Sequence, residues 1–152
     1  MQIEQIKDIL DWIVDFHQQM TQCYEHCAEQ AESLRLKMLL EYLSEHEKQL
    51  TQTISRYEEE ADPRDLNTWC LEYMDKAPVL THTLCEANLK ELDTDQIITR
   101  TVNTHNQLIE LYQYLAGRAV NERSKELFDN LISLEKHETM LMVRVSASFG
   151  DL

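Results

Sequence analysis

Glycine and proline are nearly missing from this sequence, with two of each among 152 residues. A chain built from strands and tight turns needs one of them at roughly every tenth residue, because sharp corners depend on positive φ angles or rigid bends. This chain has too few of both for such an architecture. We therefore predict an all-α fold, and the length fits a single domain over residues 1–152.

Apolar residues recur every three or four positions in four long segments, which is the pattern of amphipathic helices. The segments span residues 3–31, 33–60, 95–119 and 122–148. Ser33 is a plausible N-cap for the second segment. Pro63 ends that segment, because the residue before a proline is pushed out of the α region.

The turns inside each pair of segments are very short, whereas the two pairs are far apart in the chain. We predict two helical hairpins at residues 1–61 and 95–152, joined by a long, partly helical crossover at 62–94. A connection of that length can return the chain to its starting side. The expected architecture is a four-helix bundle with one crossover.

Acidic residues outnumber basic ones by 28 to 14, giving a net charge of −14. The bases are scattered singly among acids, which argues against a nucleic-acid partner. No apolar stretch approaches the roughly 20 residues that span a bilayer, and the N-terminus lacks the order of a signal peptide. We expect no membrane partner, a cytoplasmic location, and reduced packing thiols at the four cysteines, Cys23, Cys27, Cys70 and Cys85.

The two hairpins resemble each other in sequence. A shift of 88 residues places His17 on His105 and Tyr24 on Tyr112, together with several small and apolar residues. For the second helix of each hairpin, a shift of 91 places His46 on His137 and aligns the leucines. Chance does not readily put four histidines in register, so the pattern indicates an internal duplication and approximate two-fold symmetry.

The four matched histidines are the candidate site. His17 and His105 lie on apolar helical faces, while His46 and His137 lie nearer the edges of theirs. One inward imidazole from each helix would bring four nitrogens to one interior level, where they could bind iron, zinc or copper. The alternative is a set of core histidines bonded to one another, to buried water, or to one of Tyr24, Tyr112, Asn130 and Ser133.

These spacings resemble the ferritin-like superfamily, and most closely its rubrerythrin-type proteins. His17 to Tyr24 and His105 to Tyr112 look like the family's Glu-x6-Tyr pattern on the first and third helices, with His in place of Glu. The resemblance implies a four-helix bundle that holds two iron atoms. It also implies a ligand role for His46 and His137, which match the family's E-x-x-H on the second and fourth helices. Tyr24 and Tyr112 lie two turns from the histidines of the first and third helices, where each could orient an imidazole or simply fill core space with its hydroxyl bonded across the bundle.

Leu43 and Leu134 stand where that alignment places the E-x-x-H glutamates. Leucine cannot bind a metal, so a standard di-iron ferroxidase or peroxidase is disfavoured, and a mononuclear four-histidine centre or two weak half-sites remain. Glu47 and Glu138 are one residue, about 100°, from their histidines and are expected to face outward.

Two readings of function follow. In the first, the histidine cluster binds a transition metal for a redox or metal-handling role, with iron favoured by resemblance. In the second, the bundle is a metal-free scaffold that acts as a structural or interaction module. The apolar segment at residues 66–92, which includes Trp69, also favours a homodimer.

Overall fold

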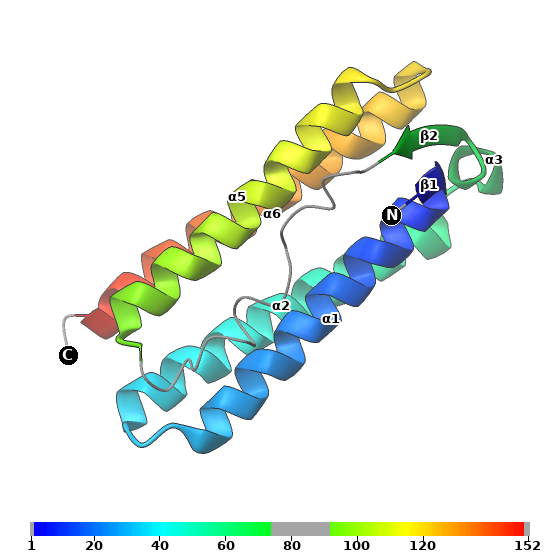
Figure 1. Ribbon diagram of the computed structural model, residues 1–152. Coiled ribbons are helices and arrows are strands. Elements are labelled where there is room, and N and C mark those ends of the chain that lie inside the picture. Colours follow the sequence, from blue (N-terminus) through cyan, green and yellow to red (C-terminus); the bar gives the residue numbers. More distant parts are fainter. Residues whose placement is uncertain (1, 74–91, 151–152) are drawn as a thin grey trace.

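The computed structural model describes residues 2–73 and 92–150, and its side chains are described over 5–68 and 92–148. Four long helices make up the bundle (Figure 1): α1 (Ile6–Gln30), α2 (Leu34–Glu60), α5 (Thr94–Gly117) and α6 (Glu122–Gly150). This architecture confirms the all-α prediction. Among the described helices, none is both long and apolar enough to cross a membrane.

Local capping explains where the helices begin. The Ser33 hydroxyl accepts a hydrogen bond from the Leu36 N–H at 3.3 Å, as the sequence predicts for the start of α2. Asp93 and Gln96 form a reciprocal capping box at the start of α5, where each side chain accepts from the other residue's backbone N–H. The first helix starts later than predicted, because residues 2–5 are extended.

A short antiparallel ribbon joins the N-terminus to the segment after α2. Strand β1 (Gln2–Gln5) pairs with β2 (Trp69–Tyr73), and one turn of helix, α3 (Pro63–Leu66), lies just before β2. The Ile6 N–H continues the pairing by donating to the Thr68 carbonyl at 3.2 Å. The helical pattern of the sequence does not predict this ribbon, because the pairing partners are more than 60 residues apart.

The helices pack as two hairpins, α1 against α2 and α5 against α6, and α2 also contacts α6 across the bundle. The chain leaves β2 at one end of the bundle and enters α5 at the other (Figure 1). Residues 74–91 of the predicted crossover, with Cys85, lie outside the described residues, as does the side chain of Cys70. The expected homodimer surface falls largely in the same segment.

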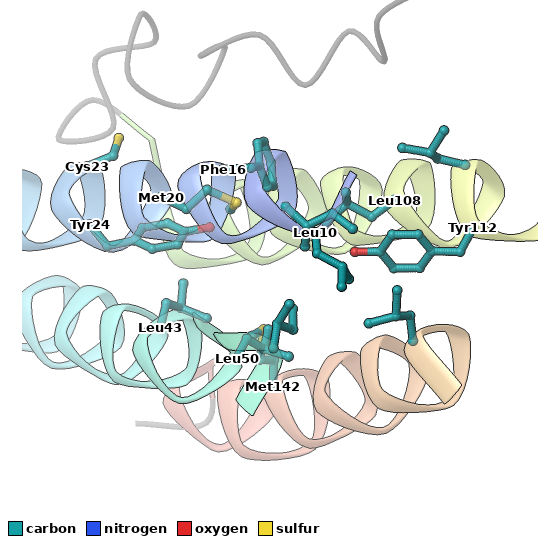
Figure 2. Packing of buried hydrophobic residues seen from close by; sticks show 14 of the residues in the cluster. Leu10, Phe16, Met20, Cys23, Tyr24, Leu43, Leu50, Leu108, Tyr112 and Met142 are labelled. Atoms are coloured by element: carbon teal, nitrogen blue, oxygen red, sulfur yellow. The ribbon is translucent and has the colours of Figure 1, made fainter. Parts of the chain in front are cut away.

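The apolar stripes of the four helices meet in one core (Figure 2). On the first helix, the stripe predicted from Ile6 to Ala31 is buried at each position up to Ala28, and Ala31, the C-cap of α1, is partly buried. On α2, Tyr57 is the exception at the end of the stripe, with 39% of its surface exposed. Among the side chains that the structure describes, ten polar or charged ones are buried along with this core, and four of them form the site.

Candidate metal centre

One ionisable side chain from each long helix lies at the middle of the bundle. The four are His17 on α1, Glu47 on α2, His105 on α5 and Glu135 on α6, and each has 0% of its surface exposed. We call them the central quartet. Charged groups are almost never fully buried unless they are paired or bind a metal, so this cluster needs a physical explanation.

His17 bridges the two carboxylates. Its Nδ1 lies 2.6 Å from Glu47 Oε2, and its Nε2 lies 2.7 Å from Glu135 Oε1. An ionised carboxylate only accepts hydrogen bonds, so both ring nitrogens must carry hydrogens for both bonds to form. In this arrangement His17 is an imidazolium held between two anions.

His105 is held differently. Its Nδ1 donates to the backbone carbonyl of Thr101 at 2.8 Å, which fixes the hydrogen on that nitrogen. Its Nε2 therefore points to the centre, 2.8 Å from Glu47 Oε1 and 3.9 Å from Glu135 Oε2. A backbone carbonyl that orients one ring nitrogen while the other faces a shared site is the usual support for a metal-binding histidine.

Charge pairing controls the protonation of the quartet. Burial by itself lowers the pKa of His17, but the carboxylates of Glu135 and Glu47 outweigh it and raise that pKa to about 10. Burial opposes the charge of His105 as well, and Glu47 and Glu135 raise its pKa to about 9. Burial raises the pKa of Glu47, yet His105 and His17 lower it to about 2. With no metal bound, the imidazolium forms of His17 and His105 and the carboxylate form of Glu47 are therefore favoured at neutral pH.

Three atoms of the quartet have no hydrogen-bond partner. They are Glu47 Oε1, His105 Nε2 and Glu135 Oε2, and all three are buried. The 2.8 Å contact between Glu47 Oε1 and His105 Nε2 is close without the alignment of a hydrogen bond. One ligand atom each from His17, Glu47 and His105 lie within 4.8 Å of one another, a spacing that one ion could bridge.

The two matched tyrosines are fully buried, and their hydroxyl groups point toward the middle of the bundle from opposite ends (Figure 2). Tyr112 donates to Glu135 Oε1 at 3.2 Å, so it supports a member of the quartet directly. Burial and the neighbouring Glu135 raise its pKa, which keeps the hydroxyl protonated. The Tyr24 hydroxyl lies 2.6 Å from Thr101 Oγ1 and so reaches the residue whose carbonyl holds His105.

Threonine hydroxyls bond to the helix backbone at the same level. Thr51 donates to the carbonyl of Glu47, and Thr139 to the carbonyl of Glu135, at 2.9 and 2.7 Å. Thr21 makes the same bond to the carbonyl of His17 at 2.9 Å. Three of the four quartet residues are therefore each followed, one turn later, by a threonine bonded back to them.

The four histidines of the sequence prediction do not meet in the structure. His17 and His105 are both in the centre, with ring centroids 5.9 Å apart. His46 is partly buried between α2 and α6, where its Nδ1 lies 2.9 Å from Glu138 Oε2, and His137 is exposed. A pair of histidines and a pair of glutamates form the cluster in place of four histidines.

The expectation that Glu47 faces outward is wrong, because its side chain is fully buried. The error comes from the shift of 91 residues used for the second helices. A single shift of 88 carries through both hairpins and places Glu47 on Glu135 and Thr51 on Thr139. A change of three residues rotates a helix by about 300°, so the leucine stripes nearly align under either shift. The leucines therefore do not distinguish the shift of 88 from the shift of 91.

Leu43 and Leu134 consequently do not replace ligand glutamates. Leu43 packs in the core, and the inward glutamates of α2 and α6 lie at 47 and 135. Read from there, E-x-x-H becomes Glu47-x-x-Leu50 and Glu135-x-x-Glu138, with the glutamate kept and the histidine lost. The signal that would have identified the pair was the repeated E-x-x-x-T spacing under the 88-residue shift.

Neither a protein-family model nor a curated protein matches this sequence. A solved structure does match: a Thermotoga maritima protein described as a proposed ferritin-like diiron-carboxylate protein, at 14% identity and a TM-score of 0.59. The match covers 97% of each chain. The bundle is ferritin-like in fold. In this ferritin-like bundle, the central quartet occupies the space between all four helices, and each helix contributes one member of it.

Proposed function

We propose that this ferritin-like protein binds one divalent transition-metal ion in its core through the central quartet. Iron is favoured by the rubrerythrin-type resemblance, and zinc or copper is allowed by the ligand chemistry. A redox or metal-handling role fits such a centre. The quartet keeps His17 and His105 from the sequence prediction and adds Glu47 and Glu135.

The observation that carries this proposal is the convergence of three buried atoms that make no aligned hydrogen bond: Glu47 Oε1 and His105 Nε2, which face each other at 2.8 Å, and Glu135 Oε2. A buried polar atom without a partner costs about 1–3 kcal/mol, which applies in full to Glu135 Oε2 and is offset in part for Glu47 Oε1 and His105 Nε2 by their ion pair, so a group that satisfies all three would be favoured. A cation binds lone pairs, and each of these atoms offers one once His105 Nε2 is deprotonated.

Charge supports the same conclusion. Two carboxylates neutralise a divalent ion when both imidazoles are neutral, which an all-histidine shell cannot do. The ion then replaces two protons and the cluster stays neutral. Mixed nitrogen and oxygen ligands suit iron and zinc, and bundle cores commonly hold such sites on facing helices.

Metal analysis of protein purified without an affinity tag tests this proposal. We expect the wild-type chain to take up a single Zn²⁺ or Fe²⁺ ion, and His105→Ala to lose it, because a ligand is removed from the core. His137→Ala is the matched control, since it removes an exposed histidine from the same bundle and should leave uptake unchanged. Equal metal content in wild type and His105→Ala would eliminate the quartet as the site.

A metal-free scaffold is the second candidate, and one observation favours it. His17 already satisfies both of its ring nitrogens with Glu47 and Glu135, so an ion must displace a bonded proton there. Under this reading the quartet is a buried ion-pair network that fixes the register of the two hairpins. Full folding with no uptake of Zn²⁺ or Fe²⁺ at neutral pH would favour the scaffold.

A further inference from the structure

The central quartet has no exposed surface, so an ion must cross the bundle wall to reach it. One wall is closed by aromatic rings. Phe16 packs edge-on against His17 with ring centroids 5.5 Å apart, and Trp12 stacks on Phe16 at 5.7 Å. An ion passing there would lose its water with no polar group to replace it.

The opposite wall, between α2 and α6, carries a polar pair. His46 Nδ1 lies 2.9 Å from Glu138 Oε2, and the two side chains are 13% and 15% exposed. His46 is the residue before Glu47, and Glu138 lies one turn beyond Glu135, about 4.5 Å along α6. The pair is thus partly exposed, and it is contributed by the same turns of the same two helices that carry the two glutamates of the quartet.

We propose that His46 and Glu138 form a transit site where a divalent transition-metal ion binds briefly before it moves to the central quartet. This inference rests on the proposed function. One imidazole and one carboxylate offer both ligand types that the quartet uses, so the ion would keep the same types of ligand as it moves inward. Two protein ligands bind the ion more weakly than four. The ion can therefore dissociate from the outer pair and move to the central quartet, as transfer between successive sites requires.

The His46–Glu138 pair also favours transition-metal ions over magnesium and calcium. Imidazole binds zinc, iron and copper but suits magnesium and calcium poorly, so the outer pair would filter the abundant hard cations. The net charge of −14 raises the local concentration of all cations at the surface, which makes such a filter useful.

The test is the rate at which Co²⁺ enters the intact metal-free chain, followed by stopped-flow absorbance of the cobalt centre. His46→Asn keeps a side-chain N–H for Glu138 but loses the imidazole ligand, and Glu138→Gln keeps the shape but loses the charge. We expect each to slow loading by about ten-fold or more. The final stoichiometry and the final spectrum should equal those of the wild type.

Asp129→Asn is the matched control. It removes one negative charge from the same helix at an exposed site, where Asp129 pairs with Lys125, and it should load at the wild-type rate.

Circular dichroism checks that all variants are folded. If Glu138→Gln is unstable, His46→Asn, which preserves the hydrogen bond, still tests the proposal. Wild-type loading rates in both variants would overturn the transit site, as would a lower final stoichiometry, which would make the pair part of the final centre. A wild-type chain that takes up no Co²⁺ refutes the proposed function itself, and that result is separate from a change in rate.

Discussion

In the α1–α2 hairpin the buried histidine is held between two carboxylates, whereas in the α5–α6 hairpin it is held by a backbone carbonyl and one carboxylate. The residue types at the matched positions are the same, His with Glu in each half. What differs is the partner of Nδ1: in His105 it is the backbone carbonyl of Thr101, and in His17 it is the Glu47 carboxylate. The two hairpins therefore carry the same ionisable groups at matched positions and hold their histidines through different contacts.

Glu47 and Glu135 should differ most clearly in stability. Glu47 contacts both imidazoles, while Glu135 contacts His17 closely and has Tyr112 as its second partner. Glu47→Gln leaves two buried imidazolium groups with one carboxylate, so we expect a loss of about 3–5 kcal/mol in the metal-free protein. We expect a smaller loss for Glu135→Gln. Urea unfolding with a chelator present measures both, and equal losses would show that the two halves are energetically alike.

The pH dependence of the metal-free protein should show both histidines as charged groups. The pKa values of His17 and His105 rise from 6.5 to about 10 and about 9 on folding, so their contribution to stability is full below pH 6.5 and is lost as the pH rises through 9 to 10. The pKa of Glu47 falls from 4.5 to about 2, so its contribution is full above pH 4.5 and is lost toward pH 2. Maximum stability is expected between about pH 4.5 and 6.5.

Unfolding in urea at pH 5.5, 7.5 and 9.5 tests this profile. His137→Ala should reproduce the wild-type curve, because that histidine is exposed and outside the quartet. A wild-type stability that stays flat up to pH 10 would mean that the two histidines are buried neutral.

Metal should stabilise the folded chain by mass action. At an ion concentration 100 times the dissociation constant, the gain is about 2.7 kcal/mol, and a chelator should reverse it. We expect His105→Ala to lose this gain. His17→Ala should lose it too, although its imidazole must first give up a hydrogen bond to a carboxylate. Thermal unfolding with and without Zn²⁺ measures the effect, and a gain retained in both variants would place the ion elsewhere.

The tyrosines should give the smallest difference. Tyr112→Phe removes a hydrogen bond to a proposed ligand, Glu135, so metal affinity should fall by about 10–100-fold. Tyr24→Phe removes a bond to Thr101 and leaves the ligands untouched, so affinity should hold while stability falls by about 1 kcal/mol. Competition for Zn²⁺ against a coloured chelator separates the two, and equal affinities would contradict a direct role for Tyr112.

Much of the fold could be predicted from the sequence, because helical periodicity and the lack of turn residues act locally. The bundle, the hairpins and the Ser33 cap were all predictable on that basis, and so were the inward positions of His17 and His105. The ribbon between β1 and β2 was not, since it depends on a pairing between distant segments.

Only the two histidines of the site, His17 and His105, could be predicted from the sequence, and its two glutamates could not. Apolar stripes locate the buried face of a helix to within about one residue, or 100°. With an uncertainty of one residue, the apolar stripe of α2 does not show whether His46 or Glu47 faces the core. Contacts with the neighbouring helices determine which of the two is buried. The burial of Glu47 is fixed by its two imidazole partners on α1 and α5, and no local pattern contains that information.

The threonines beside the quartet have a mechanical consequence. A hydroxyl bonded to the carbonyl one turn back competes for that carbonyl and often bends the helix there. In α1, α2 and α6 this weakening coincides with the turn that carries a proposed ligand. Slight outward bending at these three turns would let the charged centre accommodate ions of different radius.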